Sequence, residues 1–75
     1  MTRLPRVSGK KVVQTLERAG FKVTHVRGSH YYLRRADGGS IVPVPVHGNR
    51  TLPTGTLNSI LRLAGITSEE FRGLL

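Results

Sequence analysis

The sequence predicts one small α+β domain with the element order α-β-β-β-α: a three-stranded antiparallel meander with helices packed on one face, and a short extra C-terminal helix. Apolar residues recur at helical spacing near both ends of the chain, and β-branched and aromatic residues are concentrated between them. Gly-Ser and Asp-Gly pairs divide this middle part into three segments. A chain of 75 residues has room for one thin core, so we expect the functional site on a surface.

The first helix is expected over residues 9–19. It would follow a flexible N-terminal arm of residues 1–7, and the single domain would then span residues 8–75. Ser8 can accept a hydrogen bond from the amides of the first turn, as a helix N-cap does. Gly20 suits the left-handed position at which a helix ends. The apolar stripe that would face the core consists of Val12, Val13, Leu16 and Ala19.

Three strands are expected over residues 21–27, 30–35 and 40–47. Gly28-Ser29 would form the first turn. Asp37-Gly38 is a strong signal for a two-residue hairpin and would form the second. Connections this short predict an antiparallel meander.

The third strand is expected at an edge of the sheet. Pro43 and Pro45 are two residues apart, so the amides that they lack lie on the same side of the strand, where solvent must face them. The second strand is therefore central. A two-residue turn at Asp37-Gly38 pairs Ala36 with Gly39 and sets the register of this hairpin.

This register predicts two chemically different faces. The apolar face should carry the helices, and it holds Tyr31, Leu33, Val42 and Val44. The other face presents to solvent His30, Tyr32, Arg34, Ile41, Pro43 and Pro45, with His47 at the same end as His30.

The first strand fits this arrangement less well. A tight Gly28-Ser29 turn would put Phe21 and Val23 on the polar face. A longer loop or a bulge between the first two strands would return both residues to the core. We favour the longer loop, which would place His30 at its mouth.

The second long helix is expected over residues 55–64, with Gly65 at its end. Thr67 and Glu70 match the capping box S/T-x-x-E, which predicts a short final helix that carries Phe71 and Leu74. The stripe of the second helix consists of Leu57, Ile60, Leu61 and Ala64.

The net charge of +8 arises from twelve Lys and Arg against four Asp and Glu. Residues 1–62 hold eleven of these bases and only two acids, Glu17 and Asp37. Such a surface attracts polyanions, and nucleic acid is the first candidate; a charge that serves only solubility is the alternative.

The chain has no cysteine, no apolar run near the roughly 18 residues that cross a membrane, and no signal-like apolar stretch near its start. We therefore expect a cytoplasmic protein without membrane contact.

Several enzyme chemistries lack the residues they need. The three histidines, His25, His30 and His47, have no partners at metal-ligand spacing, so neither a metal nor another cofactor is expected. The scarcity of acids argues against paired carboxylates and two-metal catalysis. Ser29 and His30 would point to opposite faces of a strand, which argues against a Ser-His nucleophile.

Acid–base chemistry by one histidine among cations remains. An imidazole exchanges protons near neutral pH, and RNA supplies its own nucleophile, the 2′-hydroxyl. A minimal ribonuclease would use His30 as the base and cations to stabilise the phosphorane. Tyr31 or Tyr32 could stack on a base. The residues fit an alternative equally well, in which His30 only closes a turn and Tyr31 is a core residue. The residues expected to bind RNA are Lys10, Lys11, Arg27, Ser29, Tyr32, Arg34 and Arg35.

The stretch from Arg27 to Ile66, RGSHYYLRRADGGSIVPVPVHGNRTLPTGTLNSILRLAGI, resembles the HicA toxins of HicA–HicB toxin–antitoxin systems. The shared features are G-S-H, the D-G hairpin, V-P-V-H-G-N, and a helix with the pattern L-x-x-G-T-L-x-x-I-L-x-x-A-G. With the leading helix, the likeness covers about residues 8–75. Pro43 is an extra proline ahead of the usual V-P-V-H.

The resemblance implies a fold like that of double-stranded-RNA-binding domains and a ribosome-independent endonuclease that cuts single-stranded mRNA. The histidine of G-S-H, here His30, would be catalytic. Without an evident metal site in the sequence, we expect the activity to survive a chelator. A HicB-type antitoxin would cover Gly28, Ser29 and His30, and DNA would be bound only through that antitoxin. His47 is a candidate assisting acid or phosphate ligand, although a residue in this place more often only caps a strand end. His25 is expected to be structural.

Two other functions fit the same composition. A non-catalytic RNA-binding module would bind RNA with a steep salt dependence and never cleave it. A protein-interaction subunit would use its charge to match an acidic partner.

Overall fold

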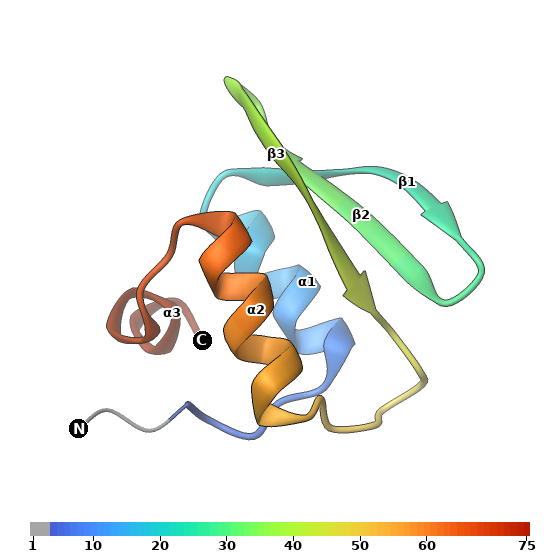
Figure 1. Cartoon of the computed structure of the whole chain (residues 1–75), viewed down its shortest axis with the longest axis vertical. Coiled ribbons are helices and arrows are strands. Elements are labelled where there is room, and N and C mark those ends of the chain that lie inside the picture. The colour runs from blue at the N-terminus through green and yellow to red at the C-terminus, as the bar shows by residue number, and fades with distance from the viewer. Residues whose placement is uncertain (1–3) are drawn as a thin grey trace.

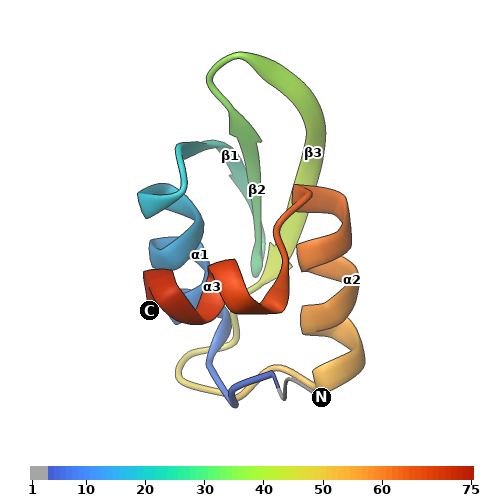
Figure 2. The same ribbon diagram turned by 90° about the vertical axis from the view of Figure 1, so that its left-hand side faces the viewer.

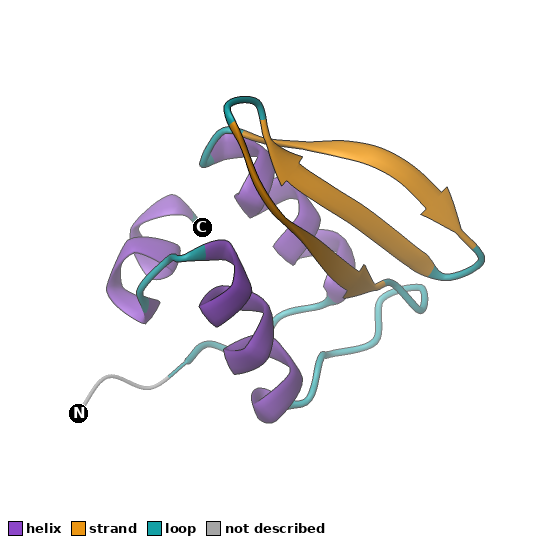
Figure 3. Ribbon diagram, turned by 45° about the horizontal axis from the view of Figure 1, so that its top comes forward, coloured by secondary structure: helices purple, strands orange, loops and turns teal. Residues whose placement is uncertain are grey.

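The computed structural model describes residues 4–75, and these form the α+β fold expected from the sequence (Figure 1). The antiparallel sheet has the strand order β1-β2-β3, so the second strand is central, as the prolines predicted. All helices lie on one side of the sheet and leave its other side uncovered (Figure 3). The elements are α1 (Gly9–Arg18), β1 (Phe21–Arg27), β2 (His30–Arg35), β3 (Gly38–Pro45), α2 (Thr54–Ala64) and α3 (Ser68–Leu74).

The core lies between the sheet and the two longer helices. Helices α1 and α2 stand beside each other against the sheet. Helix α3 crosses between them on the side that faces away from the sheet (Figure 2). The guanidinium of Arg18 donates a hydrogen bond to the carbonyl oxygen of Leu74 at 2.8 Å, which joins α1 to the end of α3. The fully buried side chains are those of Val12, Thr15, Leu16, Leu33, Val42, Val44, Leu57 and Phe71.

The expected flexible arm, residues 1–7, falls partly on residues 1–3, which lie outside the described residues. Of the others, Leu4 and Val7 pack against the core. The carbonyl oxygen of Val7 accepts a hydrogen bond from the amide of Leu52 at 2.8 Å. Residues 4–7 therefore lie against the domain. Among residues 4–75, no helix has the length and apolarity needed to span a bilayer.

A bulge in β1, and not a longer loop, returns Phe21 and Val23 to the core. Arg27 pairs directly with His30 across a tight Gly28-Ser29 turn, so the longer loop that we favoured is wrong. The pairing shifts by one residue between Val23 and His25, which leaves Thr24 as the extra residue. Because side chains alternate along a strand, this single extra residue moves every earlier side chain of β1 to the opposite face.

The hairpin between β2 and β3 keeps the predicted register near His30 but not at its tip. His30, Tyr31, Tyr32 and Leu33 pair with Pro45, Val44, Pro43 and Val42, as expected. A second irregularity between Leu33 and Arg35 then pairs Arg35 with Gly38. The turn is therefore Ala36-Asp37 and the predicted Ala36–Gly39 pair is wrong. Gly38 and Gly39, with φ of 105° and 99°, adopt the backbone that this irregular hairpin end requires.

The capping box at Thr67 is formed as predicted. The Thr67 hydroxyl accepts from the amide of Glu70, and the Glu70 carboxylate accepts from the amide of Thr67, both at 3.1 Å. These hydrogen bonds to Thr67 lower the pKa of Glu70, and Arg35 adds a weaker electrostatic effect in the same direction. The ionised form therefore favours the folded state at neutral pH, and its contribution is lost as the pH falls through this lowered pKa.

Replacing Thr67 with alanine should destabilise the domain by about 1 kcal/mol, because the first turn of α3 loses its cap. The free energy of unfolding should be measured by urea denaturation at neutral pH. Ser59→Ala removes an exposed hydroxyl from α2 and serves as the control. Equal stability of Thr67→Ala and Ser59→Ala would show that the capping box does not stabilise the fold.

Candidate active site

His30 is the first residue of β2, directly after the tight turn that closes the first hairpin. Gly28 has a φ of 59°, a left-handed conformation that glycine adopts without strain. The carbonyl oxygen of Ser29 accepts a hydrogen bond from the amide of Val46 at 2.6 Å, which ties the turn to the end of β3. The His30 side chain is exposed and opposes Arg27 on one side and Pro45 on the other. The fold thus holds one imidazole at a fixed place on the surface.

One side of the sheet is covered by no helix, and we call it the open face (Figure 3). Tyr31 and Leu33 pack on the core, so the alternating side chain of His30 lies on the open face. Three cations, Lys22, Arg27 and Arg34, lie on this face, and none of its residues is acidic. Its members are exposed or half-buried. They are Lys22, His25 and Arg27 from β1, His30, Tyr32 and Arg34 from β2, and Ile41, Pro43 and Pro45 from β3.

Tyr32 occupies the centre of the open face. Its ring stacks on the imidazole of His25 with the centroids 4.4 Å apart and the planes 5° from parallel. The His30 ring lies on the same face with its centroid 6.5 Å from that of Tyr32. The β1 bulge produces this arrangement, because it pairs His25 with Tyr32. Reasoning from the sequence left His25 outside the site, although the alternation conflict in β1 was a signal that this strand is irregular.

The structure does not bring together all the cations expected to bind RNA. Arg35 lies over the Phe21 ring, 4.8 Å from its centroid, and donates to the carbonyl oxygen of Ala64 at 3.2 Å. It therefore faces the helices, and no described contact joins it to His30. Arg34 does lie on the open face, where its Nε donates to the carbonyl oxygen of Gly39 at 3.1 Å.

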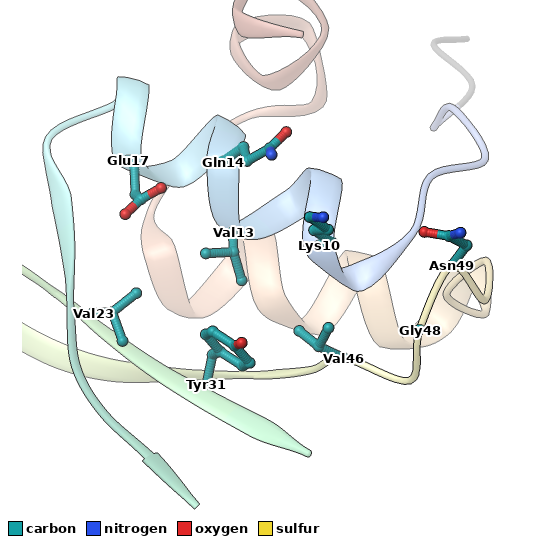
Figure 4. Close-up of a pocket in the computed structure, with 9 residues that line it drawn as sticks. All are labelled: Lys10, Val13, Gln14, Glu17, Val23, Tyr31, Val46, Gly48 and Asn49. Carbon is teal, nitrogen blue, oxygen red and sulfur yellow. The ribbon is translucent and has the colours of Figure 1, made fainter. Parts of the chain in front are cut away.

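Lys10 and Lys11 also lie away from the open face, because α1 packs on the other side of the sheet. Lys10 borders a pocket of about 410 Å³ between α1 and the strands (Figure 4). Tyr31 points into this pocket beside Val13 and Val23 and packs against the core. Of the two tyrosines proposed to stack on a base, only Tyr32 shares a face with His30.

His47 lies beyond the end of β3, since that strand stops at Pro45 and not at residue 47 as expected. It is exposed and lines a pocket of about 360 Å³ with Pro45, Arg50 and Thr56. This pocket adjoins the His30 end of the sheet through Pro45, but no described contact joins the two histidines. An assisting role for His47 stays a prediction.

The arrangement is suited to proton transfer beside a bound phosphate. Within residues 4–75, no group of three or more His, Cys, Asp or Glu side chains is placed to hold a metal ion. An exposed imidazole can accept and return a proton, and the Arg27 guanidinium next to it can neutralise a phosphate. The aromatic pair beside them offers a surface for a nucleobase.

A comparison with protein families finds a match that covers most of the chain. The family model described as the HicA toxin of bacterial toxin–antitoxin systems matches residues 9–66. This span contains α1, the complete sheet, His30 and α2, and it leaves α3 outside. A search of the curated proteins found no match.

Proposed function

The chain belongs to the HicA toxin family of bacterial toxin–antitoxin systems, and we propose that it acts as a ribosome-independent endonuclease on single-stranded mRNA, with His30 as its general base. The observation that carries this proposal is the place of His30 on the open face. The imidazole is exposed, Arg27 lies opposite it, and Tyr32 is two residues further along the same strand. Its site of action would be the cytoplasm, where mRNA is available.

The proposed reaction uses the nucleophile that RNA carries. His30 accepts the proton of a 2′-hydroxyl, and the 2′-oxygen forms a bond to the adjacent phosphorus. The bond from phosphorus to the 5′-oxygen breaks, and this oxygen takes up a proton from water. The products are a 2′,3′-cyclic phosphate, or the monophosphate formed by its hydrolysis, and a 5′-hydroxyl. Arg27 and Arg34 bind the phosphates and stabilise the charge that develops on the phosphorane.

The partner that silences the toxin would be a HicB-type antitoxin bound over Gly28, Ser29 and His30. Gly28 and His30 are exposed and Ser29 is half-buried, so the turn is accessible to a covering protein. Binding there would exclude RNA from the base directly. DNA contacts of the complex would then come from the antitoxin.

The substrate itself can test the mechanism. We expect the purified chain to cleave a 5′-labelled single-stranded RNA in the presence of EDTA, because no step uses a metal. The same oligonucleotide with a single 2′-deoxynucleotide at the cleaved position should resist cleavage at that bond alone, because the nucleophile is missing. The products should be identified by mass spectrometry.

Two results would contradict the proposal. Cleavage at the 2′-deoxy position would exclude attack by the 2′-hydroxyl. RNA binding without cleavage at any concentration of the chain would favour the non-catalytic RNA-binding module.

A further inference from the structure

We propose that His25 and Tyr32 form a base-stacking platform for single-stranded RNA, placed beside His30 on the open face. The platform would hold the nucleobase of a nucleotide next to the scissile phosphate, so His25 is a substrate-binding residue of this toxin. The inference rests on the proposed function, because it assigns a subsite to the same reaction. It is carried by the bulge, by the stacked rings and by the charge of the open face.

The Thr24 bulge delivers His25 to this position. Without the extra residue, the register in which Arg27, Val26 and His25 pair with β2 would continue along β1. Phe21 and Val23 would then lie on the open face and leave the core. With it, Phe21 is buried while His25 stays exposed on the opposite face. Bulges are frequent next to active sites because they re-aim a side chain in this way. The irregularity in β1 therefore lets one strand serve both the core and the site.

A contact with Thr24 holds the His25 ring in place. The Thr24 hydroxyl donates its single proton to the carbonyl oxygen of Tyr32, at 3.1 Å. The same oxygen lies 3.0 Å from Nδ1 of His25, within hydrogen-bond distance of the ring. Nε2 has no hydrogen-bond partner among residues 4–75. Thr24 thus holds the imidazole in one orientation and leaves its other nitrogen available to a ligand.

One face of the His25 ring is free to stack. Tyr32 covers the face that looks toward β2. Because β1 is an edge strand, no further strand covers the face that looks outward. A flat, exposed ring that is already held in place loses little conformational entropy when a base stacks on it. The ligand expected at this edge is therefore another planar ring.

The charge of the open face identifies that ligand as a nucleic acid. Lys22 and Arg34 are directly opposed across β1 and β2, an arrangement of like charges that costs stability in an isolated sheet. With Arg27 they border the aromatic pair, and no acidic side chain lies on this face to neutralise them. A phosphate backbone that runs along the face would do so while its bases reach the rings. The strand must be single, because bases in a duplex are not free to stack on a protein ring.

Binding should be measured with a chain that carries His30→Gln, so that the RNA is not cut. In this background, His25→Ala should weaken the affinity for a single-stranded RNA about tenfold, the size expected for one stacked base. His25→Phe keeps a flat ring and should retain most of the affinity. Leu63→Ala, an exposed apolar change on α2, is the matched control and should have no effect.

Two further measurements separate stacking from a charge effect or a disturbed fold. His25→Ala should leave the salt dependence of binding unchanged, whereas Arg27→Gln should reduce the slope of log K against log salt by about 1. RNAs with an abasic site at each position in turn should reveal one position at which His25→Ala causes no additional loss. A damaged fold would instead weaken binding to every RNA equally.

Three outcomes are decisive. Unchanged RNA affinity of His25→Ala, or an equal loss with every abasic RNA, would overturn the platform. Unchanged RNA affinity with weaker binding of a HicB-type antitoxin would assign the open face to the protein partner and also overturn it. Affinity that depends on His25 in a chain that never cleaves RNA would support the platform while the proposed endonuclease function fails.

Discussion

The variant His30→Ala is expected to cleave single-stranded RNA at least about 100-fold more slowly than the unmodified chain, because a general base contributes roughly that factor or more. Its affinity for RNA should change little, since the cations and Tyr32 remain in place. The fold should also be unaffected, because the His30 side chain is exposed and a surface substitution typically changes stability by less than about 0.5 kcal/mol. Cleavage is measured under single-turnover conditions and binding by fluorescence anisotropy.

Arg62→Gln is the matched control for this experiment. It removes an exposed cation from α2, on the side of the sheet opposite His30, and should leave cleavage unchanged. If His30→Ala cleaves at the normal rate while its RNA affinity is intact, the assignment of His30 as the base is wrong. If the unmodified chain and His30→Ala both bind RNA and neither cleaves it, the Gly28-Ser29 turn only positions a histidine for binding.

Local signals in the sequence predicted most of the fold because each has a direct physical meaning. Ser8 accepts a hydrogen bond from the amide of Lys11 at 3.2 Å, and Gly65 ends α2 with a φ of 70°. The start of α1 and the end of α2 therefore lie where the sequence predicted them. The two prolines identified β3 as an edge, because a missing amide proton cannot be tolerated inside a sheet. Apolar alternation then gave the register next to His30.

The sites of the strand irregularities required tertiary information. The conflict at Phe21 and Val23 showed that β1 needed a repair, but a loop and a bulge solve it equally well along the chain. The bulge pairs His25 with Tyr32 on the neighbouring strand, a tertiary contact that local sequence does not reveal. The tip of the second hairpin shifted for a related reason, since two consecutive glycines allow the strand to start earlier than a two-residue Asp37-Gly38 turn would permit.

The candidate site was predicted in part. His30, Arg27, Tyr32 and Arg34 lie on the open face. Arg35 does not, and its alternation with Arg34 already implied the opposite face. His25, which we propose as part of this site, was overlooked because only the bulge places it on the open face.

Replacing Gly9 with alanine is expected to destabilise the domain by about 3 kcal/mol or more. Gly9 is buried where the start of α1 meets the end of β3. A β-carbon there would overlap the carbonyl oxygen of Pro45, and it would lie 3.0 Å from the carbonyl carbon of Pro45 and 3.1 Å from Cα of Val46. All three atoms belong to the backbone, so no side-chain rotation can relieve the overlap. The free energy of unfolding is measured by denaturant titration.

The loss would be a large fraction of the total, because a domain of this size is stable by only about 4 to 11 kcal/mol. Gly55→Ala provides a matched control. Gly55 lies in the first turn of α2 with nothing within 4 Å of the added carbon, so alanine should leave the stability equal or raise it by up to about 1 kcal/mol. Similar stability of the two variants would show that the contact between α1 and β3 is not close.

Gly9→Ala should also reduce cleavage at temperatures where this variant is still folded. Pro45 pairs with His30, and Val46 donates to Ser29 at 2.6 Å, so a shift of this strand end is passed directly to the turn that positions the base. Cleavage by Gly9→Ala should therefore fall by more than its folded fraction predicts, whereas Gly55→Ala should cleave normally. Cleavage that follows the folded fraction alone would show that α1 stabilises the domain without positioning His30.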